Sequence, residues 1–375
     1  MSLPKSLHFA LRVLPRGAPV RRFPQARSFA SSAPRLEPSI YVSNSNDPFF
    51  NLAFEDWLFR KTDPEKKILY LYRNLPSVII GRNQNPWKEI NLARLQELGI
   101  PFVRRKSGGG TVYHDLGNTN YCVFVPRLEF DRKTNAELVV AALNKLDIPA
   151  YVNDRNDICV DSFKMRVEMH VSGSAFKLVN KRAYHHGTML IDAKLSDLRG
   201  VLGTQKDAMV TKGVASVPSP VRNLREWSQA LDHDRFVEGV AGEFAKRYGT
   251  SGEIKRIDES EAEGNEYVSE VMEELKSWDW MYGQTPEFTH DLVGSGPFDD
   301  LTLSIHSRHG LITSASISSP PSDATLWSAA SELCQVLEGD RYGTMERARL
   351  YVESTPGGEA KKRMAGMVGW LERAM

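Results

Sequence analysis

The residues with the clearest chemical meaning lie in the segment RRKSGGGTVYHDLGN, residues 104–118. Three successive glycines, Gly108, Gly109 and Gly110, follow a predicted strand, and such a run would be costly inside a regular element. Glycines permit close backbone approach, and their N–H groups can point at an anion. Arg104 and Arg105 precede them, and guanidinium groups bind phosphate or carboxylate in a forked geometry. The pattern favours an anion site; a tight strand connection is the alternative.

This glycine segment differs from two common nucleotide-binding motifs. No Gly-Lys-Ser/Thr follows it, and no helix opens directly after it, so neither a Walker loop nor a dinucleotide fingerprint is indicated. His114 and Asp115 come next and either act in catalysis or cap the following turn. His185 and His186 are adjacent on a predicted strand, where neighbours point to opposite faces, so a zinc pair is not expected.

Periodic apolar residues predict the helices and strands that must hold this segment in place. Helical patterns cover residues 51–61, 88–98 and 133–146, and one or two stretches within 221–248. Strand patterns cover residues 68–73, 77–82, 101–105, 119–125, 150–152, 158–160, 171–176 and 183–191. The Asn-Leu-Pro connection between the first two strands indicates a hairpin.

A change of pattern divides the chain near residue 286. Residues 251–275 are rich in Glu, Gly and Ser, which is typical of an exposed helix or a connector. Residues 301–318 alternate apolar and polar positions about a His-Gly turn, which predicts a hairpin, and helical patterns follow at 324–337, 341–353 and 358–374. The expected parts after the N-terminal segment are a larger domain, a linker with a helix, and a small C-terminal α+β domain, at 37–250, 251–285 and 286–375.

The first 36 residues have the composition of a mitochondrial transit peptide. No acidic residue precedes Glu37, whereas seven lysines and arginines and several serines do. A disordered basic tail is the alternative. The composition predicts delivery to the mitochondrial matrix and a fold that begins after residue 36.

Charge and cysteine usage exclude several classes. Lys and Arg number 48 against 47 Asp and Glu, so no global charge attracts the chain to nucleic acid or membrane. No apolar run approaches the roughly 18 residues of a membrane span. The three cysteines lack metal-ligand spacing, which favours a reducing compartment over a disulfide framework.

The glycine segment resembles the signature of the lipoate–protein ligase A family, in the biotin/lipoate protein ligase superfamily. Further blocks similar to that family follow in order: RNDI at 155–158, VSGSAFK at 171–177, HHGTML at 185–190, KGVASVPSPVRNL at 212–224 and WMYGQTPEF at 280–288. Ordered blocks are far more specific than any one motif. With its N-terminal segment, the chain looks like a fungal-type mitochondrial member.

The resemblance implies a fold and a reaction. The fold is α+β, a biotin/lipoate-ligase-like mixed sheet with flanking helices, plus a small C-terminal accessory domain. Lipoate or octanoate reacts with ATP, accompanied by Mg²⁺, to give an acyl-adenylate, and a carrier lysine then takes the acyl group. The implied partners are lipoyl domains of 2-oxoacid dehydrogenase acyltransferase subunits and the glycine-cleavage carrier protein.

Site residues carry over position by position. Residues expected to bind the acyl group or ATP are Arg104, Ser107, Gly108, Gly109, Gly110, Thr111, Val112, Asn156, Asp157, Ser172, Gly173, His186 and Lys212. Among them, Asp157 is also the expected ligand of Mg²⁺, which prefers oxygen ligands.

The sequence departs from the family at its essential lysine. The family has lysine directly before V-S-G-S-A, whereas His170 stands before Val171 here. Deleting MRVEMH, residues 165–170, would place Lys164 in that position and restore the pattern. Three explanations stay open: a shifted splice site or incorrect gene prediction, an insertion that still lets Lys164 reach the site, and a real loss of the lysine.

These explanations leave three functions. The first is an ATP-dependent lipoate–protein ligase. The second is a lipoyl or octanoyl transferase that uses a preformed donor such as lipoyl-AMP, acyl-CoA or an acyl carrier. The third, favoured only if the lysine is lost, is a catalytically impaired protein that binds lipoyl domains.

Overall fold

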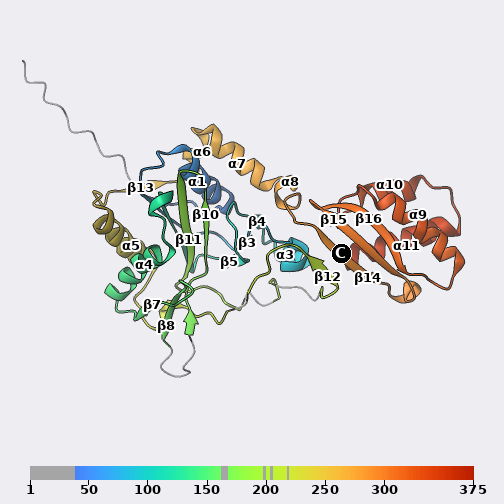
Figure 1. Ribbon diagram of the computed structural model, residues 1–375, viewed down its shortest axis with the longest axis horizontal. Coiled ribbons are helices and arrows are strands. Elements are labelled where there is room, and N and C mark those ends of the chain that lie inside the picture. The colour runs from blue at the N-terminus through green and yellow to red at the C-terminus, as the bar shows by residue number, and fades with distance from the viewer. Residues whose placement is uncertain (1–38, 162–167, 197–199, 203–205, 218) are drawn as a thin grey trace, which may run out of the picture. The chain divides into compact units, whose positions relative to one another are not determined.

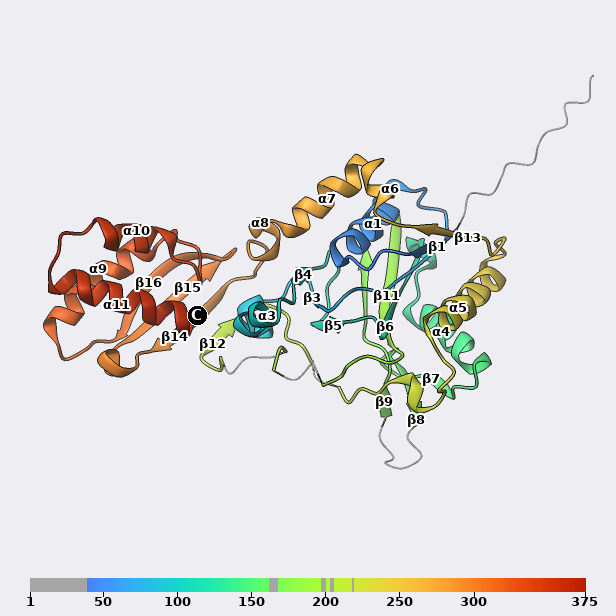
Figure 2. The same ribbon diagram turned by 180° about the vertical axis from the view of Figure 1, so that it is seen from behind.

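The computed structural model describes residues 39–161, 168–196, 200–202, 206–217 and 219–375 (Figures 1 and 2). These residues belong to one compact unit, Pro38–Met375. The predicted transit peptide and Lys164 lie outside the described residues. Within the described part of the chain, no helix combines the length and the apolar character needed to cross a bilayer.

The main sheet is mixed and has six strands. Their order is β10 (Ser174–Leu178), β11 (Arg182–Leu190), β6 (Asn118–Pro126), β2 (Ile68–Tyr72), β1 (Ile40–Ser43) and β13 (Ile254–Ile257). Strand β1 runs parallel to β2 and β13, and the other neighbours are antiparallel. The sheet contains β13, so the expected linker at 251–285 was partly wrong: Ile254–Ile257 are held by pairing with β1.

Helices cover both faces of this sheet. One face packs against α1 (Pro48–Lys61) and α7 (Glu266–Lys276), and the other against α4 (Arg132–Lys145) and α5 (His233–Tyr248). Alternate residues of β6 serve the two cores, because successive strand side chains point to opposite faces: Cys122 joins the α1 core and Val123 the α4 core. Figure 1 shows α4 and α5 beside each other, away from α1.

Helix ends follow ordinary capping rules. Asp47 accepts a hydrogen bond from Phe49 N at the start of α1, and Asp131 accepts one from Thr134 N at the start of α4. Helix α5 ends at Gly249 in the left-handed region, with φ of 64°. The remaining short helices are α2 (Pro86–Glu89), α3 (Leu92–Leu98), α6 (Ser260–Glu263), α8 (Trp278–Met281), η1 (Arg127–Glu129), η2 (Leu224–Glu226) and η3 (Gly296–Phe298).

Two small sheets carry the predicted site segments. The first contains β4 (Phe102–Arg104), β3 (Ser77–Ile80) and β5 (Val112–His114), in that order. The second contains β7 (Ala150–Val152), β8 (Ile158–Asp161) and β9 (Glu168–His170). The predicted hairpin of residues 68–82 was wrong, because β3 pairs with β4 and β5 whereas β2 pairs with β1 and β6.

The C-terminal residues form the predicted α+β arrangement. Its sheet contains β12 (Met209–Thr211), β14 (Phe288–Val293), β15 (Thr302–Arg308) and β16 (Leu311–Ser319), and its helices are α9 (Ala324–Leu337), α10 (Glu346–Ser354) and α11 (Glu359–Ala374). The hairpin about His309 and Gly310 is confirmed. Strand β12 was not predicted, and it inserts a segment from before residue 250 into this sheet.

Candidate functional site

The glycine loop connects β4 to β5 and presses against the end of β3. A Cβ atom built on Gly81 would lie 2.0 Å from the carbonyl oxygen of Gly109. Gly109 itself has φ of 86°, in the left-handed region that favours glycine. Two glycines are therefore required by contact and by conformation, which agrees with the close backbone approach inferred from the sequence.

The side chain of Arg105 holds the glycine loop through hydrogen bonds to its carbonyl oxygens. Its Nη2 donates to the carbonyl oxygens of Gly108 at 2.6 Å and Gly110 at 2.7 Å. Its Nε donates to Ser107 Oγ at 3.0 Å, and its Nη1 to Ile79 O at 3.1 Å. Burial lowers the pKa of Arg105 to about 10, so its guanidinium remains charged at neutral pH. The loop carbonyls are thus fixed by a buried cation.

The same arrangement leaves donors for a ligand. Within the described part of the chain, the N–H groups of Gly108, Gly109 and Gly110 donate to no acceptor, although two of these residues' carbonyls are bound to Arg105. Successive unpaired backbone amides form an anion-binding concavity. The structure therefore contains the donors that the glycine pattern predicted.

Arg104 has different surroundings. Its five N–H donors reach the carbonyl oxygens of Arg82, Gln84 and Met281 and the hydroxyl of Thr285, at 2.7 to 3.0 Å. The side chain is fully buried, and burial lowers its pKa to about 9. In this arrangement Arg104 ties β4 to the end of α8 and to Thr285 after it. Its expected contact with the adenylate stays a prediction.

A cluster of polar side chains that the sequence did not predict holds Thr111, the residue that follows the three glycines. Ser216 Oγ accepts from Thr111 N at 2.9 Å and donates to Glu89 Oε2 at 2.5 Å. Gln84 Oε1 accepts from Gly81 N at 2.8 Å and from Thr111 Oγ1 at 3.0 Å. The block at 212–224 therefore reaches the loop through Ser216.

Lys212, at the start of that block, points elsewhere. It is exposed and pairs with Glu287 at 2.9 Å. The structure does not bring it to the glycine loop.

His186 and Ser107 meet beneath the loop. Ser107 Oγ lies 2.8 Å from His186 Nε2, and His186 Nδ1 lies 3.0 Å from both carboxylate oxygens of Glu55. Sequence reasoning missed Glu55, although an acid inside the apolar pattern NLAFEDWLF was the available signal. His114 is bound separately, with Nδ1 2.9 Å from Asn74 Nδ2.

A second group of predicted residues lies along β8 to β10. Asp157 Oδ2 is 3.0 Å from Arg155 Nη2 and 3.8 Å from His170 Nδ1. Asn156, the residue before Asp157, has φ of 64°. His170 is held on both sides, since its N donates to Pro220 O and its carbonyl accepts from Arg222 N, each at 3.0 Å.

Ser172 and Gly173 link this group to the glycine loop. Gly173 N donates to Thr188 Oγ1 at 2.9 Å, and a Cβ on Gly173 would lie 3.6 Å from Val112 Cγ1. Ser172 Oγ lies 3.5 Å from Tyr121 OH. The structure therefore brings Ser107, His186 and Gly173 to the glycine loop or to β5 beside it. Asp157 lies near His170, and Lys212 lies apart.

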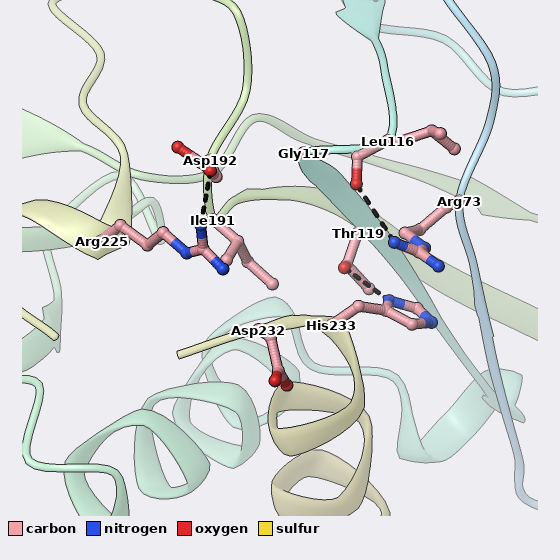
Figure 3. A pocket seen from close by; sticks show the side chains of 9 residues that line it. All are labelled: Arg73, Leu116, Gly117, Thr119, Ile191, Asp192, Arg225, Asp232 and His233. Carbon is pink, nitrogen blue, oxygen red and sulfur yellow. Dashed lines mark hydrogen bonds and ion pairs between the residues drawn. The ribbon is translucent and has the colours of Figure 1, made fainter. Parts of the chain in front are cut away.

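A separate cavity of about 280 Å³ is lined in part by Leu116 and Gly117 of the HDLGN turn (Figure 3). Arg225 on its wall is already paired with Asp192 at 2.7 Å, and Thr119 Oγ1 lies 2.8 Å from His233 Nδ1. None of the predicted site residues lines it.

His185 gives a test of polar burial beside the site. It is fully buried, and within the described residues neither ring nitrogen has a hydrogen-bond partner. Burial lowers its pKa to about 3, so protonation favours the unfolded chain as pH falls from about 6.5 towards 3. We expect His185→Leu to be more stable by about 1–3 kcal/mol at pH 7.5, because it removes an unpaired buried polar group.

The same substitution has a pH signature. Its advantage over the wild type should grow by about 1.4 kcal/mol per pH unit below 6.5. Urea unfolding of both proteins at pH 7.5 and 5.5 measures this. A variant that is less stable at both values would contradict the prediction.

Known proteins resemble this chain in sequence and fold. The family model of the lipoyl protein ligase A/B catalytic domain matches residues 47–245. LipL1 of P. falciparum, solved in complex with lipoate, is 27% identical with a TM-score of 0.56, over 89% of this chain and 99% of its own. Lipoate-protein ligase A bound with ATP is 25% identical with a TM-score of 0.54, over 65% of this chain and 98% of its own. An archaeal bi-partite lipoate protein ligase from Thermoplasma acidophilum is 24% identical with a TM-score of 0.54 over 65% and 96%, and shows the fold alone.

The family match extends from the cap of α1 into α5 and contains the glycine loop and the β8–β11 segments. It covers more than half of the 375 residues. The predicted α+β fold of the biotin/lipoate-ligase type is confirmed. This chain belongs to the lipoyl protein ligase A/B catalytic-domain family and is an enzyme of lipoate ligation or transfer.

Proposed function

We propose that this protein is an ATP-dependent lipoate–protein ligase. The carboxylate of lipoate attacks the α-phosphate of ATP, which gives lipoyl-AMP and pyrophosphate. The ε-amine of a carrier lysine then attacks the acyl carbon, forms an amide and releases AMP. Octanoate, which has the same carbon chain as lipoate without the dithiolane sulfurs, is the second candidate substrate.

The observation that carries this proposal is the set of amides at Gly108, Gly109 and Gly110, which have no acceptor among the described residues. Both steps build or redistribute negative charge on a phosphate and an acyl oxygen, and preorganised N–H donors stabilise such charge. Arg105 holds the loop so that these donors need no rearrangement during the reaction. The protein contributes positioning and charge stabilisation rather than a covalent intermediate.

The residues around Asp157 are suited to nucleotide and Mg²⁺. A carboxylate together with substrate phosphates is the usual way in which proteins bind this ion. Asp157 offers one such carboxylate beside Asn156, and Arg155 balances its charge at 3.0 Å. When bound, Mg²⁺ would neutralise phosphate charge, while the loop amides would orient the α-phosphate.

The carrier is proposed from a relative. The Thermoplasma acidophilum structure is described together with its E2 lipoyl domain. We infer that lipoyl domains of 2-oxoacid dehydrogenase acyltransferase subunits, and the glycine-cleavage carrier protein, are the acceptors here. The basic, acid-free N-terminal segment supports a location in the mitochondrial matrix.

One observation favours a transferase as the second candidate. The position before Val171 holds His170, whose Nδ1 faces Asp157 at 3.8 Å, instead of a lysine. Histidine has a shorter side chain than lysine and lacks its ammonium group, so it is less suited to stabilise negative charge during adenylation. A transferase using preformed lipoyl-AMP would avoid that step.

The test is an in vitro lipoylation assay. Purified protein is incubated with lipoate, MgATP and an apo lipoyl domain, and the domain is examined by intact mass spectrometry. Lipoylation in this mixture supports the ligase. Lipoylation only when synthetic lipoyl-AMP replaces lipoate and ATP supports the transferase, and no lipoylation from either overturns both.

A further inference from the structure

We propose that Glu55 is a positioning residue for the loop Gly108–Gly110, which would bind the acyl-adenylate. Glu55 acts on this loop indirectly, through His186, Ser107 and Arg105. The four side chains form one hydrogen-bonded chain, called the relay below. The inference rests on the proposed function, because it explains how the cradle of that reaction is held in place.

The relay runs unbroken from α1 to the glycine loop. The Glu55 carboxylate lies 3.0 Å from His186 Nδ1, and His186 Nε2 lies 2.8 Å from Ser107 Oγ. Ser107 Oγ accepts from Arg105 Nε at 3.0 Å. Arg105 then grips the loop carbonyls, as described above.

For an ionised Glu55 and a neutral His186, the chemistry of each group sets the direction of every bond. Arg105 can only donate, so Ser107 accepts from it and its hydroxyl hydrogen is left for His186 Nε2. A carboxylate can only accept, so His186 carries its hydrogen on Nδ1 and gives it to Glu55. The tautomer of His186 is thus set by Glu55, and the orientation of Ser107 is set by that tautomer.

Burial makes this order hard to replace by water. Glu55, His186, Ser107 and Arg105 are 3%, 8%, 1% and 4% exposed, respectively. Tyr72 OH also donates to Glu55 at 3.3 Å, and the charge of Glu55 favours the charged form of Arg105. The buried carboxylate of Glu55 and the buried guanidinium of Arg105 are therefore connected through two neutral side chains. Removing either charge leaves the other buried charge uncompensated.

Two other uses of this cluster fit less well. Serine, histidine and acid in this order also form nucleophilic triads, but Ser107 is almost fully buried and is held by Arg105. Cys122 lies within 4.8 Å of Glu55 and His186, as a metal site would need. Both ring nitrogens of His186, however, already have hydrogen-bond partners in Glu55 and Ser107.

The test compares two buried carboxylates that are neighbours on α1. Glu55→Leu removes the acceptor for His186, and Glu55→Gln keeps an acceptor oxygen. Asp56→Leu is the matched control, because Asp56 is equally buried but pairs with Arg60 at 2.9 Å, outside the relay. Affinity for a non-hydrolysable lipoyl-sulfamoyl-adenosine is measured by calorimetry, and thermal unfolding is recorded for each protein.

We expect Glu55→Leu to bind the analogue roughly 100-fold more weakly, the scale of a small misplacement at a reacting centre. Glu55→Gln should retain most of the affinity, and Asp56→Leu should keep wild-type affinity while losing a similar amount of thermal stability. Equal losses in Glu55→Leu and Asp56→Leu would mean a merely structural role and would overturn the relay.

A second measurement separates this inference from the proposed function. In ¹⁵N-histidine-labelled protein, NMR should show His186, assigned through His186→Gln, with its hydrogen on Nδ1, and Glu55→Leu should change that tautomer. A wild type without lipoylation or analogue binding would overturn the proposed function, and the tautomer would still decide the relay. An Nε2–H tautomer in the wild type, or one unaffected by Glu55→Leu, would sink the relay alone.

Discussion

Gly81→Ala is expected to lower kcat/KM for acyl-adenylate formation by at least about 100-fold. The new Cβ atom would lie 2.0 Å from the Gly109 carbonyl oxygen and 3.2 Å from the Gly108 carbonyl carbon. Both neighbours are backbone atoms, so no side-chain rotation relieves the contact. The loop must move, and the amides of Gly108–Gly110 move with it. Pyrophosphate release from lipoate and MgATP measures the loss directly.

A second alanine substitution serves as the control for Gly81→Ala. Gly242 lies within α5, and a Cβ there meets no heavy atom within 4 Å. Gly242→Ala should leave adenylation unchanged and stabilise the protein by up to about 1 kcal/mol, since alanine is the better helix former. Gly81→Ala with wild-type pyrophosphate release would refute the close packing of β3 against the loop.

The second large effect is a gain. His170→Lys should raise the rate of acyl-adenylate formation by about 10²–10³-fold at pH 8, the usual worth of one stabilising contact to developing negative charge. The backbone at this position is fixed by Pro220 and Arg222, so the new ammonium would start from a defined point near Asp157. Single-turnover formation of lipoyl-AMP from lipoate and MgATP gives the rate.

His170→Met is the matched control, because it has comparable length and no charge. It should not exceed the wild type. If His170→Lys and His170→Met are equally active, a lysine at position 170 does not do the work of the family's lysine. Lys164 is then the remaining candidate. Deleting residues 165–170 would then be the direct comparison.

The deletion also bears on the origin of the MRVEMH segment. Glu168–His170 form β9, which pairs with β8 through Cys159 and Val160, so this part of the segment has a regular place in the fold. Six residues correspond to an in-frame step in a transcript. Sequencing transcripts across codons 160–175 decides between a splice difference and an encoded insertion: MRVEMH in every transcript would exclude an incorrect gene prediction.

The fold was readable from the sequence where contacts are local. The hairpin about His309 and Gly310 and the helices of the C-terminal part were predicted because turn residues and periodicity lie within one stretch. The pairing of β3 was not, because its partners β4 and β5 follow about 20 to 35 residues later and nothing in residues 77–80 selects them over a nearby strand. Strand β12 was not predicted because its partner, β14, is also distant in the sequence and because it is only three residues long.

The site divides along a similar line. The glycine loop was found because only glycine meets its contacts, and the resemblance supplied its companions. Arg104 and Arg105 could not be told apart by type, yet Arg105 holds the glycine loop whereas Arg104, at the end of β4, binds the last residue of α8. Glu55 was missed because a buried acid on a helix is recognisable only when its distant partner, His186, is known.

Strand β12 gives the C-terminal part a share in the larger domain's folding. Met209–Thr211 pair only with β14 among the described strands, and Trp87 packs in the same core as Phe288 and Tyr342. Dividing the chain at residue 286 would therefore leave each fragment with an incomplete hydrophobic core. The two parts of the protein should unfold in one cooperative thermal transition. Separately expressed fragments should restore activity only if they fold together, because neither is expected to fold alone.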